Sequence, residues 1–506
     1  MTRETPTAPQ PPAERTQSSL ERTASHPHLA LPIRAPGAAA RAAVRAAADK
    51  KLRDSELSDV AGLDEMTGMV RGATGRAVDP FKLLPPELAA AIFQHLDDRS
   101  LARAAQVSRR WYRVASTPAV WRAVFLSQWM PRAPVAMGGR GIGPDITAAQ
   151  QWQKMARARR AVERNWEAQK PNAIYFTGHT DSVYCAQFDE RKLITGSRDR
   201  TIRVWDMQTY RCIKVIGGPQ AKPKAPAEEL ETHPRTVVAH PSLNGTPEGD
   251  VIFHVPSDYH TASILCLQFD DDILVTGSSD STCIVWDVKT YQPRHRLRYH
   301  SAGVLDICFD ETRIISCSKD WNICVWDRAT GQLLKVLAGH KGPVNAVQMR
   351  GDMLVSASGD GYSKLWDLNR MCEVRCFNSQ DRGLAAVEFS DDGAYVLAGG
   401  NDQLIYKYSA STQACIARLS GHQGLVRSLY LDGANGRIIS GSYDQDVRVY
   451  SFESGRELGV YSNWTTSWIL AAKSDWRRIV ATSQDGRAVV LDFGFGVEGV
   501  DLLRGA

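Results

Sequence analysis

The chain has 506 residues, of which 43% are hydrophobic and 23% are charged, and its formal net charge at pH 7 is +5. This length exceeds what one ordinary core serves, so we expect a large repeat domain with smaller segments attached. No apolar run approaches the ~20 residues that cross a bilayer, and the N-terminus has no basic-then-apolar signal segment, which predicts no membrane contact and a location in the cytoplasm or nucleus. The net charge is modest for a nucleic-acid-binding protein.

Residues 1–78 are rich in Pro, Ala, Thr and Arg and contain few large apolar residues. Such a segment cannot bury enough surface to offset the entropy of ordering, so it predicts a disordered tail. Within it, residues 38–54 have high helix propensity and are a candidate for a helix that forms on a partner. The sequence leaves open a homodimer formed through this tail.

Residues 79–129 predict a small domain of three or four short helices. Pro85 and Pro86 suit the entry of a helix, where a missing N–H costs nothing. Leu88, Ile92 and Leu96 follow at helical spacing, and further helical stretches are SLARAAQV, RRWYRVA and AVWRAVF. About fifty residues give a small core, so we expect this domain to be stabilised by a neighbour or a partner.

Residues 130–170 form a linker that combines a Gly/Pro-rich loop with a basic helix at 149–169. The large apolar residues of this helix fall on one stripe: Trp152, Met155, Val162 and Trp166. We interpret the helix as a rigid spacer that packs on its neighbours. RNA binding through the basic face is the alternative.

Residues 171–506 contain a repeated unit of two strands joined by a tight turn. Clear copies are LITGSRDRTIRVWD, LVTGSSDSTCIVWD, IISCSKDWNICVWD and LVSASGDGYSKLWD, and weaker copies are VLAGGNDQLIYKYS, IISGSYDQDVRVYS and IVATSQDGRAVVLD. The tryptophan position recurs at Trp205, Trp286, Trp326, Trp366, Tyr408, Tyr450 and Leu491. After a first interval lengthened by a loop insertion at 217–259, the steps are 40, 40, 42, 42 and 41 residues. A period near forty with four short strands per unit is typical of a propeller blade.

The seventh unit has three predicted strands, and the segment 173–176 ahead of the first copy is a strand without a unit of its own. We expect this segment to complete the seventh blade and close the ring, which covers the strand edges. The clear copies end in Trp-Asp and resemble WD repeats. The predicted fold is an all-β seven-bladed WD-repeat propeller preceded by a small α-helical domain and a disordered N-terminal tail.

Histidine, Ser or Thr, and Asp recur in each of the first four units, in an arrangement similar to a hydrolase triad. The sets are His179/Thr195/Asp199, His260/Thr276/Asp280, His300/Ser316/Asp320 and His340/Ser356/Asp360. An active site is not repeated four times at a fixed period. We therefore interpret these residues as hydrogen-bonded networks that hold each loop against its strands, and we expect no catalytic residue.

Ten cysteines lie between Cys185 and Cys415, mostly inside predicted strands. Their spacing contains no C-x-x-C pair of the kind that binds metal. We interpret them as small buried apolar residues in a reducing compartment, and we expect no metal and no cofactor.

Two positions in each unit are expected to face the mouth of the central channel, and their side chains differ from copy to copy. The first position precedes each turn aspartate: Arg198, Ser279, Lys319, Gly359, Asn401, Tyr443 and Gln484. The second follows each loop histidine, or its equivalent, by five residues: Tyr184, Leu265, Leu305, Asn345, Ala385, Arg427 and Leu470. Together with Arg382 and Ser263, these residues predict a rim of four cations and several hydroxyls with almost no acid. A phosphorylated or acidic peptide requires such a rim.

Two groups of motifs carry resemblances to known families. The LPPEL opening, the leucine-rich first helix and the SRRWYRVAS stretch of residues 79–129 resemble an F-box, whose helices bind the Skp-type adaptor of a cullin-based ubiquitin ligase. That resemblance implies an adaptor-binding set: Leu84, Pro85, Pro86, Leu88, Ile92, Leu96 and Leu101. The stretches SVYCAQFDERKLITGSRDRTIRVWD, SILCLQFDDDILVTGSSDST, IISCSKD, LVSASGD and GSYD resemble blades of the beta-TrCP group of F-box/WD-repeat proteins, whose top face reads short motifs that carry phosphoserines.

Matched by position, the second resemblance implies a phosphopeptide-binding set: Tyr184, Arg198, Ser263, Ser279, Leu305, Lys319, Asn345, Gly359, Arg382, Ala385, Arg427 and Tyr443. Leu470 stands where that group has an arginine, and the insertion at 217–259 is foreign to it, so related F-box/WD proteins that read other phosphodegrons or regulate sulphur metabolism stay open. The resemblance implies a non-catalytic substrate receptor of an SCF-type ubiquitin ligase. Its partners would be the adaptor, the cullin and phosphorylated substrates destined for ubiquitination and proteasomal degradation. The alternative is a WD-repeat scaffold for a stable assembly.

Overall fold

The structure, a computed structural model, describes residues 70–71, 77–79, 81, 84–129, 151–219, 236–238, 252–378 and 383–503. The chain divides into two compact units, residues 1–103 and 104–506. Within the predicted tail, β1 (Val70–Arg71) pairs antiparallel with β2 (Ala77–Val78). The rest of the predicted tail, up to residue 76, lies outside the described residues, and so does the predicted loop of the linker, 130–147.

The first unit contains α2 (Pro86–Phe93), and it contains α3 (Asp98–Ala104) up to the unit boundary. Pro85 precedes α2 in an extended conformation and Pro86 occupies its first turn, as the sequence predicts. The ring of Phe81 lies 4.9 Å from that of Phe93, and Leu101 of α3 is fully buried.

The second unit begins with α4 (Arg109–Ala115), α5 (Pro118–Trp129) and α6 (Trp152–Glu167). Helix α4 starts at an N-cap, Ser108, whose hydroxyl accepts a hydrogen bond from the Trp111 N–H at 3.2 Å. Helices α5 and α6 pack together, with the rings of Phe125 and Trp152 5.7 Å apart.

Helix α6 is also fixed to the last blade of the propeller. The Trp166 ring stacks on Phe493 with 3.7 Å between centroids, and its indole N–H donates to the Trp476 carbonyl at 3.1 Å. Arg159 donates to the same carbonyl at 3.2 Å. All four residues of the predicted apolar stripe are buried, which confirms that this face packs on its neighbours. The RNA-binding alternative for the exposed basic face stays a prediction.

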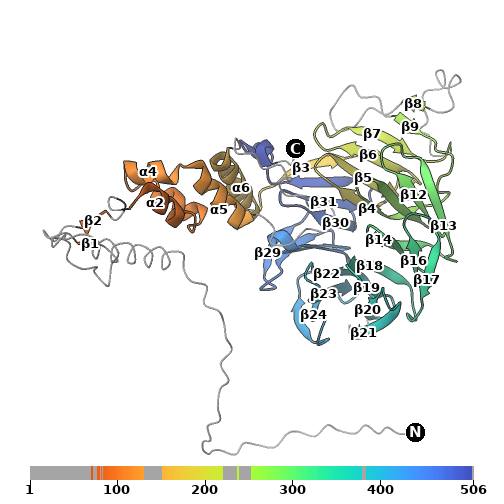
Figure 1. The fold of residues 1–506 in the computed structure, drawn as a ribbon. Coiled ribbons are helices and arrows are strands. Elements are labelled where there is room, and N and C mark those ends of the chain that lie inside the picture. Colours follow the sequence, from red (N-terminus) through yellow and green to blue (C-terminus); the bar gives the residue numbers. More distant parts are fainter. Residues whose placement is uncertain are drawn as a thin grey trace, which may run out of the picture. The chain divides into compact units, whose positions relative to one another are not determined.

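Seven sheets follow one another around a central axis in the second unit (Figure 1). The strands of the first four sheets are β4 (Val183–Phe188), β5 (Lys192–Ser197), β6 (Ile202–Asp206), β7 (Cys212–Ile216); β10 (Ile264–Phe269), β11 (Ile273–Ser278), β12 (Thr282–Asp287), β13 (Pro293–Arg298); β14 (Val304–Phe309), β15 (Arg313–Ser318), β16 (Ile323–Asp327), β17 (Leu333–Leu337); β18 (Val344–Arg350), β19 (Met353–Ser358), β20 (Tyr362–Asp367) and β21 (Cys372–Asn378). The remaining sheets hold β22 (Leu384–Phe389), β23 (Tyr395–Gly400), β24 (Ile405–Ser409), β25 (Cys415–Leu419); β26 (Val426–Asp432), β27 (Arg437–Ser442), β28 (Val447–Ser451), β29 (Glu457–Tyr461); β30 (Ile469–Ser474), β31 (Arg478–Ser483) and β32 (Ala488–Asp492). Two 3-10 turns, η3 (Gly433–Asn435) and η4 (Val500–Leu503), complete the described elements.

The ring closes as the sequence predicts. Strand β3 (Asn172–Phe176) pairs antiparallel with β32, with Ala173 opposite Leu491 and Phe176 opposite Ala488. The seventh blade is therefore built from both ends of the propeller segment, and no blade in the described part of the ring lacks its fourth strand. The seven-bladed architecture is confirmed.

The insertion after the first blade contributes strands, where the sequence predicts only a surface loop. Strand β9 (Ile252–His254) runs parallel to β7, and β8 (Thr236–Val238) pairs antiparallel with β9, so the first sheet has six strands. Phe253 of β9 is buried against the first blade. The residues between and before these strands, 220–235 and 239–251, lie outside the described residues.

The blades are held to one another by apolar side chains between adjacent sheets. Trp205 of the first blade packs with Phe176 and Val490 of the seventh, and Trp286 of the second packs with Ile194 of the first. Seven of the ten free cysteines are buried in these layers, as predicted, whereas Cys372 and Cys415 on outer strands are exposed. None of the helices in the described ranges is long and apolar enough to cross a membrane.

Candidate functional site at the mouth of the central channel

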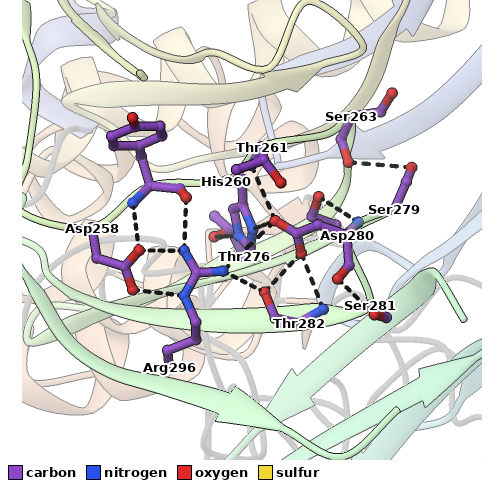
Figure 2. A network of polar contacts seen from close by, with 12 residues as sticks. Asp258, His260, Thr261, Ser263, Thr276, Ser279, Asp280, Ser281, Thr282 and Arg296 are labelled. Carbon is purple, nitrogen blue, oxygen red and sulfur yellow. Dashed lines mark hydrogen bonds and ion pairs between the residues drawn. The ribbon is translucent and has the colours of Figure 1, made fainter. Parts of the chain in front are cut away.

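A chain of hydrogen bonds joins the recurring polar residues, and the second blade shows it clearly (Figure 2). The Trp286 indole N–H donates to the Thr276 hydroxyl oxygen at 2.8 Å, and that hydroxyl lies 2.9 Å from Nε2 of His260. Nδ1 of His260 lies 2.9 Å from an oxygen of Asp280. Because the tryptophan can only donate, the hydroxyl proton goes to Nε2 and the Nδ1–H goes to the carboxylate. Each buried polar atom in this chain has its partner.

The same chain occurs around His179, His300 and His340, and His422 keeps the bonds to Ser440 and Asp444 without the tryptophan, which confirms that these residues form structural networks. The fifth and seventh blades lack the histidine, but their turn aspartates find other donors. The Tyr406 hydroxyl donates to Asp402 at 2.6 Å, and the Thr466 hydroxyl donates to Asp485 at 2.7 Å. The turn aspartate therefore accepts a side-chain hydrogen bond in blades with and without a histidine.

The acidic and histidine side chains of these networks each keep one charge state at neutral pH. Burial alone would raise the pKa of Asp360, but hydrogen bonds from His340 and from the Lys341 N–H outweigh it and lower that pKa to about 2. Burial lowers the pKa of His179, although the neighbouring Asp199 carboxylate opposes this effect. The aspartates thus remain ionised at neutral pH, and His179 remains neutral.

The channel-facing position five residues after each loop histidine is a β-bulge in every blade. The register of the innermost strand with its neighbour shifts at this residue in each sheet: Tyr184, Leu265, Leu305, Asn345, Ala385, Arg427 and Leu470. All seven line a central cavity of about 1640 Å³. A bulge re-aims one side chain out of the alternation of a strand, so the fold presents one residue per blade to the channel.

The residue before each turn aspartate is tied to the same loop by a backbone hydrogen bond. The N–H of Arg198 donates to the carbonyl of Ser182, two residues before the bulge residue Tyr184, at 2.9 Å. Equivalent bonds start from the N–H groups of Ser279, Lys319, Gly359, Asn401, Tyr443 and Gln484. Both predicted sets therefore lie at the same end of the channel, which we call the channel mouth.

The predicted cations occupy different environments. Arg427 is half-buried, and its guanidinium donates to the Ala385 carbonyl at 3.4 Å. The guanidinium Nε of Arg198 lies 3.7 Å from an oxygen of Asp181, with 59% and 42% of the two side chains exposed. Lys319 is exposed on the third blade, and Arg382 lies outside the described residues. Asp181 is an acid at the rim that the sequence analysis did not single out.

The other predicted mouth residues also have defined partners or exposure. Ser279 donates from its hydroxyl to the Ser263 carbonyl at 3.5 Å, and the Asn345 amide donates to the Leu384 carbonyl at 2.6 Å. The Tyr443 ring stacks on Trp468, 4.4 Å between centroids. Gly359 is exposed at its turn. Trp468 lies two residues before the bulge residue Leu470, and Asp181 lies three residues before Tyr184. These offsets from the bulge would have located both residues in the sequence.

Charged groups inside the channel were also missed by the sequence analysis. One residue below the bulge, the Asp306 carboxylate accepts backbone N–H bonds from Val347 and Ile307, each at 2.9 Å. Three residues below the bulge, Glu388 accepts from the Gln348 amide at 3.1 Å, and burial raises its pKa to about 7 against the opposing effects of nearby cations. Lys473 occupies the corresponding position in the seventh blade. A count of residues along each innermost strand would have placed these groups in the channel wall.

The helical segment carries the residues that resemble an adaptor-binding set. Pro85 and Pro86 are exposed and half of Leu88 is exposed, whereas Ile92 and Leu96 are half-buried. Leu84 and Leu101 are buried within the described structure, so their side chains contribute to packing. The exposed members offer a surface, and adaptor contact by any of them stays a prediction.

Comparison with protein-family models matches both parts of the chain. The F-box-like model matches residues 81–127, and the WD domain, G-beta repeat model matches residues 170–206, 256–287, 291–327, 331–367 and 413–451. The chain combines an F-box-like segment with WD repeats. The fifth and seventh blades, which lack the histidine, are mostly outside the matched ranges.

Several curated relatives are similar to part of this chain. A probable E3 ubiquitin ligase complex SCF subunit sconB of Arthroderma benhamiae is 30% identical over 164 residues, covering 28% of this chain and 25% of that protein. An F-box protein of Saccharomyces cerevisiae is 32% identical over 156 residues, covering 27% of this chain and 24% of that protein. The F-box/WD repeat-containing protein 7 of Drosophila melanogaster is 31% identical over 150 residues, covering 28% of this chain and 11% of that protein. The chain thus spans a quarter or less of each of these relatives.

A solved structure supports the propeller assignment. The WD40 beta propeller domain of Doa1 superposes with a TM-score of 0.50 at 20% identity, covering 63% of this chain and 95% of that one. This similarity concerns the fold alone.

Proposed function

We propose that this protein is the substrate-recognition subunit of an SCF-type ubiquitin ligase and that the channel mouth binds phosphorylated peptides. The F-box-like segment would bind a Skp-type adaptor and, through it, a cullin. The propeller would hold the substrate for a conjugating enzyme, so its contribution is proximity and orientation, and it performs no bond-making step itself.

One observation carries the phosphopeptide proposal: the fold brings cations and hydroxyls together at one end of the channel. Arg427 projects from a bulge into the cavity, while Arg198 and Lys319 occupy turns tied to the same loops. A phosphate group carries nearly two negative charges and three acceptor oxygens, and Arg or Lys side chains are its usual partners. The relatives named as SCF subunits support the ligase half of the proposal.

Co-purification of the full chain with a Skp-type adaptor and a cullin tests the ligase half. We expect capture by the native chain and loss of capture by Leu88→Glu, because 50% of the Leu88 side chain is exposed on α2. Leu334→Glu is the matched control, since Leu334 is 51% exposed on an outer strand of the propeller. Failure of the native chain to capture the adaptor would instead favour a propeller scaffold for a stable assembly.

Binding to synthetic peptides tests the recognition half. We expect peptides that contain phosphoserine to bind the full chain, and the same peptides without phosphate to bind weakly. Arg427→Ala is expected to reduce this binding while leaving adaptor capture unchanged. Equal binding of phosphorylated and unphosphorylated peptides would contradict the proposal.

A further inference from the structure

The third blade carries an exposed tryptophan in its turn at the channel mouth. Trp321 follows the turn aspartate Asp320, and 51% of its surface is exposed. Its backbone has φ of 75°, in the left-handed region that large side chains adopt only at a cost. In the described part of the chain, its side chain has no ring partner and no hydrogen-bond partner.

The equivalent turn position in the other six blades holds a polar residue or glycine. These residues also have positive φ: Arg200, Ser281, Gly361, Gln403, Gln445 and Gly486. The turn therefore does not require an aromatic side chain. About half of the Trp321 surface is exposed and its side chain makes no network contact, so the turn itself gives no reason for an aromatic residue here.

A second exposed aromatic residue flanks the same turn. Tyr299 is 51% exposed and precedes His300, whose Nδ1 lies 2.9 Å from Asp320. The N–H of Ser301 also donates to Asp320, at 3.0 Å. Tyr299 and Trp321 are thus the chain neighbours of two residues that are hydrogen-bonded to each other. We call Tyr299 and Trp321 the blade-three aromatic pair.

Lys319 supplies a cation in this turn, directly before Asp320. Its N–H is held by the Gly303 carbonyl at 3.0 Å, and its side chain is exposed. The equivalent positions in the adjacent blades are Ser279 and Gly359, so this position supplies one cation across three successive blades. A single-stranded nucleic acid needs a row of cations along successive phosphates. One lysine beside exposed aromatic rings instead fits a peptide with one phosphate and a neighbouring apolar residue.

We propose that the blade-three aromatic pair is a specificity subsite that binds an apolar residue adjacent to the phosphorylated residue held by Lys319. The proposal rests on the proposed function, because it assumes that the channel mouth binds phosphopeptides. Trp321 buries its exposed ring against the apolar side chain. The ligand thereby covers an aromatic surface that the fold leaves open.

The natural residues of other blades supply variants that we expect to fold. Trp321→Gly reproduces the turn of the fourth blade, where Gly361 has φ of 86°, and Trp321→Arg reproduces that of the first, where Arg200 has φ of 70°. We expect Trp321→Gly to melt at the same or a higher temperature than the native chain, because glycine adopts positive φ without strain. A loss of binding in this variant therefore does not arise from misfolding.

The test uses the full chain and a peptide library with one fixed phosphoserine and randomised flanking residues, together with its unphosphorylated copy. We expect the native chain to enrich apolar residues at one flanking position and both variants to lose this enrichment while still preferring the phosphorylated library. The selected peptide should bind Trp321→Gly about fivefold more weakly, the range for an aromatic contact.

Three other results overturn the inference, and they separate it from the proposed function. An unchanged flanking preference in Trp321→Gly, with phosphate dependence retained, overturns the subsite alone. Absence of phosphate-dependent binding by the native chain overturns the proposed function and the subsite with it. Binding of an oligouridine probe that exceeds peptide binding and is lost in Trp321→Gly assigns the aromatic pair to nucleic acid.

Discussion

Asp280 and Ser279 are adjacent in the chain but belong to two different regions of the molecule (Figure 2). Asp280 lies in the buried network and accepts hydrogen bonds from His260, Thr261 and Thr282. Ser279 lies at the channel mouth and is exposed. The network position is an aspartate in all seven blades, whereas the mouth position holds a different residue in each. The repeat thus builds the scaffold, and the residue just before each repeated aspartate is free to serve a ligand.

Removing the network residue should have the largest effect. Asp280→Ala leaves His260 Nδ1–H and the Thr282 hydroxyl without their acceptor, and we expect a loss of roughly 3 kcal/mol of stability, as for other broken buried networks. Thermal unfolding of the full chain measures this change.

Substitution of the neighbouring residue, Ser279, is the control. Ser279→Ala removes one weak hydrogen bond of 3.5 Å from an exposed residue, and its effect on stability should stay within about 0.5 kcal/mol. Similar losses from both substitutions would contradict the division between network and mouth.

Glu388 lies in the channel wall, three residues below the bulge residue Ala385, and belongs to neither of these two regions. The pKa of Glu388 in the folded protein is about 7, above the ordinary value of 4.5. Between pH 4.5 and pH 7 the folded state therefore keeps a proton that the unfolded state has released. Stability contributed by this group is therefore fully present below pH 4.5 and is lost as the pH rises through about 7. Glu388→Gln should raise stability at pH 8 by roughly 3 kcal/mol, since the pKa values of 4.5 and about 7 differ by 2.5 and each pKa unit corresponds to about 1.4 kcal/mol.

Melting temperatures of the native chain and Glu388→Gln between pH 4.5 and pH 8 test this expectation. The difference between the two proteins should grow with pH. A constant difference across this range would mean that nearby cations, Arg350 first and then Lys473, offset the effect of burial on the pKa of Glu388.

The sequence was sufficient for much of the scaffold because the scaffold is repetitive. The spacing of Trp205, Trp286, Trp326 and Trp366 predicted the blades, and the unpaired segment ahead of His179 predicted the closing strand β3. Strands β8 and β9 were not predicted, because they occur once and their pairing with β7 depends on a partner distant in the chain.

The candidate site was predictable only in part, because only some of its residues occupy repeated positions. A fixed offset from each histidine located Arg427 and its equivalents, but it did not reveal that each of them is a bulge. The ion pair between Arg198 and Asp181 and the exposure of Trp321 depend on how loops fold, and no periodic pattern encodes them. Leu101 belongs to the predicted adaptor-binding set, yet it is fully buried.

At the mouth itself, Arg427→Ala should weaken phosphopeptide binding by more than about 1.5 kcal/mol, the usual range for charged hydrogen bonds. Arg427 is half-buried in the cavity wall, so its charge is less screened by water than that of an exposed residue. Titration of a fluorescent phosphopeptide measures the loss, and adaptor capture should not change. A loss of stability comparable to that of Asp280→Ala would place Arg427 with the scaffold instead.

The smallest expected effect concerns Arg198 and its acidic neighbour. Arg198 is 3.7 Å from Asp181, and both side chains are largely exposed, so the carboxylate competes with a ligand phosphate for the guanidinium. Asp181→Asn removes that competition and should strengthen phosphopeptide binding by about 0.5 kcal/mol, a typical value for an exposed ion pair. The gain should decrease as salt is added, because exposed charges are screened. Since Arg198→Ala removes the cation, adding Asp181→Asn to it should give no gain; an equal gain in that double variant would mean that Asp181 repels the phosphate directly and does not act through Arg198.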